Sequence, residues 1–132
     1  MGNGKASKYL IYVCLLAAMV FLTTNLISLY IFNRTPHIHD EAAYNFQAKI
    51  FLTGRLYVPS PCAKEIFDFP HVVNNGRWYS QYPPGFPALL SIGYIFKAPW
   101  IINTLFAALT IILIFFLGIE LFDETVAFLA SL

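Results

Sequence analysis

Charged residues are the scarcest class in this sequence. Only 11% of the 132 residues are charged, whereas 58% are hydrophobic, and the mean hydropathy is +0.65. This composition excludes an ordinary soluble domain and predicts an integral membrane protein. The 8 basic and 7 acidic residues leave a net charge of +1, which argues against a nucleic-acid partner. No dense basic cluster is present to recruit the chain to an anionic membrane surface.

Cysteine and processing signals are also scarce. The two cysteines are Cys14, inside the first apolar run, and Cys62, in the polar stretch after it. Their difference in membrane depth argues against a mutual disulfide, so cysteine usage leaves the redox compartment open. Ala6 stands where an N-myristoylation signal needs Ser or Thr. No A-x-A-like site follows the first apolar run, which disfavours a cleaved signal peptide.

Two apolar runs predict transmembrane helices. Residues 9–32 carry no charge and extend about 36 Å as a helix, enough for a hydrocarbon core of about 30 Å. Residues 98–122 form a second run of sufficient length. Lys5 and Lys8 favour a cytoplasmic N-terminus over residues 1–8, but Arg34 stands just past the other end of the first span. Charge alone therefore leaves the orientation open.

Two further apolar segments are too short to cross. The apolar run 86–96 reaches only about 16 Å as a helix, so we expect an interfacial or re-entrant helix over residues 86–97. Residues 123–132 begin a new apolar run after an acidic cluster, and we interpret them as the start of a truncated third span. The resulting fold class is an all-α integral membrane protein whose loop, 33–85, contains an amphipathic juxtamembrane helix and a small β-hairpin.

The amphipathic helix is predicted over residues 41–53. Polar Glu41, Asn45 and Lys49 recur every fourth residue beside an apolar face. Asp40 suits the N-cap of this helix, and Gly54 suits its end. Such a helix can lie along a membrane surface.

Asp40 and Glu41 are the first candidates for chemistry. Capping is the plainer role for Asp40, but an oriented, ionised carboxylate is also what a general base or a metal ligand must be. Glu41 points elsewhere on a helix, so one acid can act while the other orients. His37 and His39 would share one side of an extended segment near Asp40. This leaves a divalent-metal site open as a weaker alternative to hydrogen bonding with a phosphate or headgroup.

A β-hairpin is predicted over residues 69–80. Asn74, Asn75 and Gly76 separate two short β-type runs, and Asn and Gly accept the positive φ of tight turns. We expect the hairpin to pack over the amphipathic helix. Its aromatic residues can stack on sugar rings or anchor the chain at the interface, and His71 and Arg77 can face an anionic phosphate.

The order of these parts resembles a known family. A first span, the Asp40–Glu41 pair heading a helix, the Pro83–Pro84 turn, a short apolar helix and a span opening with Pro99–Trp100 follow one another. This order is similar to the N-terminal part of the GT-C glycosyltransferases that use polyprenyl-phosphate sugars. These include protein O-mannosyltransferases, aminoarabinose transferases and RgtA/B/C/D-like enzymes. The resemblance covers residues 9–132 but only the opening portion of such an enzyme.

The resemblance implies a site and a location. Asp40 matches the family's catalytic base in the first extracytoplasmic loop, and Glu41 lies beside it. The implied partners are a polyprenyl-phosphate-linked sugar and lipids of the plasma (inner) membrane, with the loop extracytoplasmic. Several members have a Glu–Lys pair where this chain has Gln81–Tyr82, which puts any phosphate or metal contact there in doubt. Together with the residue patterns above, the candidate substrate-binding residues are His39, Tyr44, His71, Arg77 and Tyr82.

A binding function is the alternative to catalysis. The chain would then be a non-catalytic membrane subunit that binds a lipid-linked sugar or docks with a larger membrane chain supplying the missing spans. A pocket for a sugar, a lipid phosphate and an acceptor needs walls on several sides, and few spans supply few walls. We therefore expect this portion by itself to be incomplete as a transferase.

Overall fold

The computed structural model describes residues 3–132, and their side chains from Tyr9 onwards. The chain is mostly helical, 64%, with one small sheet. It divides into two compact units. The helical unit comprises the N-terminal segment up to Ile31 and the segment Asn103–Leu132, and the loop unit comprises Phe32–Ile102.

Two long apolar helices dominate the helical unit. They are α1, Asn3–Tyr30, and α5, Trp100–Leu121, whose first residues belong to the loop unit. The stretches Tyr9–Tyr30 and Trp100–Leu121 are each 22 residues long and apolar enough to cross a membrane. They correspond to the apolar runs 9–32 and 98–122. The expected cytoplasmic segment 1–8 lies partly outside the described residues, and from Asn3 its backbone already belongs to α1.

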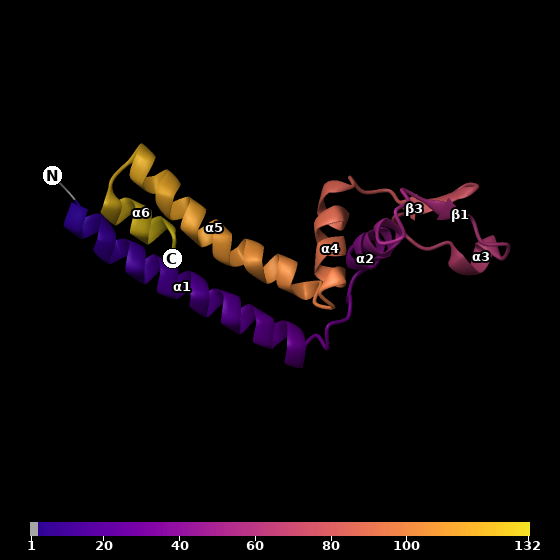
Figure 1. Ribbon diagram of the computed structural model, residues 1–132, viewed down its shortest axis with the longest axis horizontal. Helices are drawn as coiled ribbons and strands as arrows, with labels where there is room; N and C mark the ends of the chain where they lie inside the picture. Colours follow the sequence, from indigo (N-terminus) through magenta and orange to yellow (C-terminus); the bar gives the residue numbers. More distant parts are fainter. Residues whose placement is uncertain (1–2) are drawn as a thin grey trace. The chain divides into compact units, whose positions relative to one another are not determined.

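A short third helix packs into the helical unit. It is α6, Glu124–Ala130, which lies beside α1 in Figure 1. Its Ala127 is fully buried with Val13 of α1 and Phe115 of α5. A Cβ at Gly118 would come within 2.6 Å of Ala127 Cα, so only glycine allows this close approach. The segment expected to start a third span is therefore a packed helix of 7 residues.

A polar contact between Asn25 and Thr104 joins the two long helices. Asn25 Nδ2 donates to Thr104 Oγ1 at 2.8 Å and to the Phe21 carbonyl of its own helix at 2.8 Å. Thr104 is buried. This interhelical hydrogen bond satisfies polar atoms on otherwise apolar surfaces.

The loop unit combines helices with a three-stranded sheet (Figure 1). Its strands are β1, Val58–Pro59, β2, Val72–Asn74, and β3, Arg77–Ser80, in the order β1-β3-β2. Both pairings are antiparallel. The hairpin expected over 69–80 is β2 and β3, and of its turn residues Gly76 alone has a positive φ, +95°. Strand β1 was not predicted, because a two-residue strand has no period to detect.

Three helices complete the loop unit: α2, His39–Phe51, α3, Lys64–Phe67, and α4, Gly85–Ile95. The helix α4 occupies most of the segment 86–97. It packs against α2, where the Tyr94 hydroxyl donates to Asn45 Oδ1 at 2.7 Å. The face of α2 that the sequence marks as polar therefore takes part in packing.

The predicted cap of α2 is wrong. The helix begins at His39, two residues earlier than expected, and its N-cap is Ile38, which makes no side-chain capping bond. Asp40 lies inside the first turn, where a negative charge still complements the helix dipole. Glu41 takes over the local hydrogen bonding, because its Oε2 accepts from the His37 backbone N–H at 2.8 Å. The side chain of Asp40 is thereby free to bind elsewhere. At the other end Gly54 follows the helix with φ +71°.

Candidate functional site

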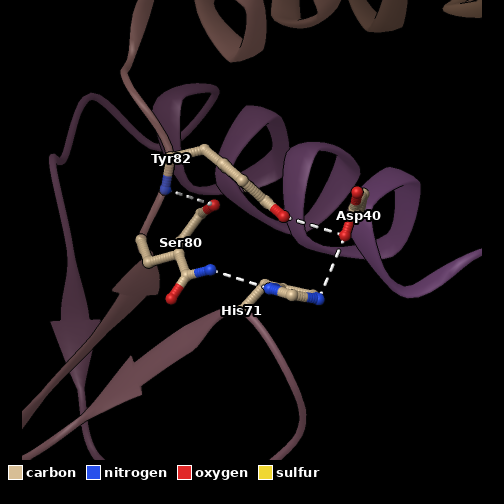
Figure 2. Close-up of polar contacts among 5 residues, drawn as sticks. Asp40, His71, Ser80 and Tyr82 are labelled. Atoms are coloured by element: carbon tan, nitrogen blue, oxygen red, sulfur yellow. Dashed lines mark hydrogen bonds and ion pairs between the residues drawn. The ribbon is translucent and has the colours of Figure 1, made fainter.

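Polar side chains from three segments of the loop unit meet at Asp40 (Figure 2). Asp40 comes from the first turn of α2, and His71 directly precedes β2. Gln81 and Tyr82 directly follow β3. The cluster therefore lies where the open end of the hairpin meets the N-terminal turn of α2.

Tyr82 and His71 both contact the same carboxylate oxygen of Asp40, Oδ1. The Tyr82 hydroxyl donates to Asp40 Oδ1 at 2.8 Å, and His71 Nε2 lies 3.1 Å from the same atom. Gln81 Nε2 lies 2.7 Å from His71 Nδ1. A Gln81 amide that donates to Nδ1 selects the histidine tautomer with its proton on Nε2, which then donates to Asp40.

The other oxygen of Asp40 is available. Oδ2 accepts no hydrogen bond from the side chains described, those of Tyr9 onwards, or from the described backbone, and the Asp40 side chain is 48% exposed. A carboxylate that is oriented through one oxygen and open at the other can accept a proton from a bound hydroxyl. Glu41 does not share this position, because it binds the His37 backbone. The two acids are therefore not a catalytic pair.

Tyr82 acts as a donor to the carboxylate. Partial burial raises the pKa of the Tyr82 hydroxyl above its usual 10.0, and so do its hydrogen bond to Asp40 and the negative charge of that carboxylate. The hydroxyl therefore stays protonated and keeps donating to Asp40 at neutral pH.

Aromatic rings line one side of the cluster. Tyr44 packs against Tyr82 with ring centroids 4.6 Å apart and against Phe86 at 5.2 Å in an edge-on arrangement. The rings of His71 and Tyr82 are 5.5 Å apart. The Tyr82 ring therefore packs against two neighbouring rings, which restricts its rotation.

Gln47 holds the hairpin in the register that forms the cluster. Its Oε1 accepts from the Ser80 backbone N–H at 2.9 Å, and its Nε2 donates to the Leu56 carbonyl at 2.9 Å. Gln47 and Ser80 are each only 4% exposed. One buried amide of α2 therefore fixes both the end of β3 and the segment that precedes β1.

His71 has an unusual backbone. Its φ is +66°, a conformation that costs energy for residues other than glycine. The Gln81 N–H donates to the His71 carbonyl at 3.0 Å and extends the β2–β3 pairing by one step. The left-handed turn occurs at the residue whose ring reaches Asp40.

Three sequence candidates lie outside the cluster. Arg77 is at the opposite end of β3 from Ser80, with its guanidinium 4.6 Å from the centre of the Tyr57 ring. His37 Nε2 is 3.1 Å from the Phe32 carbonyl. His39 is exposed and makes no hydrogen bond or ion pair among the described residues. The structure does not bring His37 and His39 to Asp40 as a ligand set, since no group of three His, Cys, Asp or Glu suited to a metal occurs in residues 3–132.

Sequence reasoning missed two members of this arrangement. Gln47 was not among the polar positions singled out in the amphipathic helix, because a buried glutamine has no local signal. Gln81 was noted only as a departure from the Glu–Lys pattern of the family that the chain resembles. It contacts His71, while its neighbour Tyr82 contacts Asp40. The two departing positions therefore complete the cluster.

Comparisons with protein-family models, curated proteins and solved structures find no match to this chain.

Proposed function

We propose that this chain is part of a membrane glycosyltransferase that transfers a sugar from a polyprenyl-phosphate donor to an extracytoplasmic acceptor. The observation that carries the proposal is the Asp40 carboxylate, which is oriented by His71 and Tyr82 through Oδ1 and open at Oδ2. The resemblance of the segment order to GT-C enzymes supports the same assignment. Acceptors in this class are lipids, glycans or proteins.

The proposed reaction needs one base. Asp40 Oδ2 takes the proton of the acceptor hydroxyl, and the acceptor oxygen attacks the anomeric carbon of the donor sugar. The bond between that carbon and the phosphate oxygen breaks, and the lipid phosphate leaves with the bonding electrons. The configuration at the anomeric carbon inverts. His71 and Tyr82 are positioning residues, because they hold Asp40 and not the reacting atoms.

The leaving phosphate needs positive charge from elsewhere. His71, which contacts Asp40, carries no charge in the tautomer that Gln81 selects, and Arg77 stacks on Tyr57 at the far end of β3. Within this proposal, residues beyond the cluster, or another chain, neutralise the phosphate.

The proposal includes membrane insertion. We infer that α1 and α5 cross the plasma (inner) membrane with the loop unit on its extracytoplasmic side. Large apolar side chains such as Leu15, Leu22 and Leu113 are more than 60% exposed, which in water would be costly. The exposed Cys62 offers a test of sidedness. In a Cys14→Ala variant, a membrane-impermeant maleimide added to intact cells should label Cys62, and labelling only after lysis would contradict this orientation.

The catalytic proposal is tested by transfer. The full chain is placed in proteoliposomes with polyprenyl-phosphate-linked, radiolabelled sugars, and label transferred to acceptor is counted. Asp40→Asn should lower transfer at least about 100-fold, the usual contribution of a general base. Asp68→Asn, which changes an exposed acid of the same unit, should leave the rate unchanged. Equal rates for Asp40→Asn and the unaltered chain would rule out Asp40 as the base.

A second candidate function is a non-catalytic membrane subunit. An open, apolar groove of about 290 Å³ lies in the helical unit and favours this function. It is lined by small residues of α1, namely Cys14, Ala17 and Ala18, and by Ala108 of α5 among others. Small residues allow another helix or an acyl chain to approach closely. Stable co-purification with a larger membrane chain, together with binding of polyprenyl phosphate but no transfer, would favour this function over catalysis.

A further inference from the structure

A second polar site lies on the sheet of the loop unit, apart from the Asp40 cluster. Asn74 of β2 and Trp78 of β3 are directly opposed in the antiparallel register, so their side chains lie on the same face. Trp78 packs against Phe46 of α2, with ring centroids 4.5 Å apart, and against Phe67 of α3 at 5.6 Å. This face therefore lies beneath two helices.

Each of the two residues carries a buried polar atom without a partner among the described residues. These atoms are Asn74 Oδ1, an acceptor, and Trp78 Nε1, a donor. Asn74 is only 5% exposed, and its Nδ2 makes one long contact of 3.5 Å with the Lys64 carbonyl. Buried polar atoms almost always have a partner, because an unpaired one loses its hydration without compensation.

The two atoms are complementary, and their residues are direct cross-strand neighbours. Directly opposed residues of an antiparallel pair have Cβ atoms about 4.5–5.5 Å apart, so one small group can reach both side chains. That group must donate to Oδ1 and accept from Nε1–H. A hydroxyl does both, whereas an ammonium lacks an acceptor and a carboxylate lacks a donor.

We propose that Asn74 and Trp78 bind one hydroxyl group between the two strands, donating to Asn74 Oδ1 and accepting from Trp78 Nε1–H. The hydroxyl comes from a buried water or from a sugar. Phe67 is 43% exposed, so the edge of this aromatic site is open to a ligand. The site does not depend on Asp40 as a base and stands if that proposal fails.

The test observes the indole proton of Trp78 directly. The full chain is labelled with ¹⁵N in its tryptophan indoles and studied by NMR in detergent micelles. A Trp100→Phe variant assigns the two indole signals, since Trp78 and Trp100 are the only tryptophans. Magnetisation transfer from water to Trp78 Hε1 is measured before and after addition of methyl glucoside.

Either of two results would support the site, and they distinguish a bound water from a sugar as the source of the hydroxyl. A long-lived water contact that the sugar does not change identifies water. A Trp78 indole shift that saturates with sugar, with loss of the water contact, identifies a sugar hydroxyl. The proposal is overturned if Hε1 shows no long-lived water contact and no sugar-dependent shift, or if it exchanges as fast as a solvent-exposed indole.

Variants at the turn give a matched control. Asn74→Ala removes the acceptor and should abolish the water or sugar contact. Asn75→Ala changes an exposed neighbour whose side chain makes no hydrogen bond among the described residues, and it should keep the contact. If Asn74→Ala loosens the hairpin, the measurement on the unaltered chain still decides the proposal.

Discussion

The two units of this protein differ in their side-chain hydrogen bonds, which are mostly local in the helical unit and long-range in the loop unit. In the helical unit, side-chain hydrogen bonds mostly return to the carbonyl three or four residues earlier in the same helix, as for Thr23 and Thr24. Asn25 is the described exception that reaches the neighbouring long helix. In the loop unit, Gln47, Gln81 and Tyr82 bind residues 9 to 42 positions away in sequence.

This difference matters for function. Local hydrogen bonds satisfy polar atoms without fixing one element against another, so the packing of the helical unit depends on apolar contacts such as those among Val13, Phe115 and Ala127. Long-range hydrogen bonds in the loop unit fix strand register and orient a carboxylate. Chemistry is therefore expected in the loop unit, and support in the helical unit.

Substitution of Gln47 is expected to cause the largest loss of unfolding free energy. Gln47→Leu leaves the buried Ser80 N–H unpaired and removes the bond to the Leu56 carbonyl, which should lower the free energy of unfolding by about 2–4 kcal/mol. Asn25→Leu in the helical unit should cost only about 0.5–1 kcal/mol, because under the proposed membrane insertion its hydrogen bond is of the weak interhelical kind. Chemical unfolding in detergent micelles, followed by Trp78 fluorescence and circular dichroism, measures both. Equal losses of unfolding free energy in the two variants would mean that long-range hydrogen bonds stabilise the loop unit no more than Asn25 stabilises the helical unit.

Close glycine contacts should have the next largest effect, and in both units. A Cβ at Gly118 would lie 2.6 Å from Ala127 Cα, and one at Gly93 would lie 2.7 Å from Pro99 Cα. Gly118→Ala and Gly93→Ala should each lower stability by about 1–3 kcal/mol, as overpacking does. Gly85→Ala is the control, because nothing lies within 4 Å of its added Cβ. Stabilisation by Gly118→Ala would show that α6 is not held against α5 as described.

His71 allows backbone strain to be separated from side-chain contact. Both His71→Asn and His71→Val remove the ring that contacts Asp40. Asparagine tolerates a φ of +66°, whereas a β-branched valine does not. The valine variant should therefore be less stable by about 1–2 kcal/mol, measured by the same unfolding assay. Equal stabilities of the two variants would mean that the turn relaxes.

The smallest effect is expected from the Tyr82 hydroxyl and depends on pH. Its folded-state pKa is raised above 10.0, so its stabilising contribution is complete below that value and is lost as pH rises through the folded pKa. Unfolding free energy should fall more steeply above pH 10 in the unaltered chain than in Tyr82→Phe. Tyr79→Phe serves as the control and should retain the steep fall. Parallel pH curves for Tyr82→Phe and the unaltered chain would contradict the Tyr82–Asp40 bond.

Local patterns predicted much of the fold. Two apolar runs of sufficient length predicted the two long helices, since composition and length decide that property. The turn residues Asn74, Asn75 and Gly76 between two short β-type runs predicted the hairpin. The N-cap assignment of Asp40 failed because the chain enters the helix earlier, and Glu41 binds the preceding backbone instead.

The candidate site was predicted only in part. Asp40, Tyr44, His71 and Tyr82 were singled out, and the structure brings these four together. Arg77 and His39 were singled out by the same reasoning and lie elsewhere. Residue type shows what a side chain can do, but strand register decides which side chains meet.

The sequence by itself determined the apolar helices, the hairpin turn and the acidic start of α2, because each depends on residues close together in the chain. Only the tertiary structure decided that Gln47 pairs with Ser80, that His71 and Tyr82 share one oxygen of Asp40, and that Asn74 opposes Trp78. These contacts join residues 4 to 42 positions apart across different turns and strands. Such contacts depend on the register of the sheet and on how α2 packs against it, and neither is encoded in any single segment.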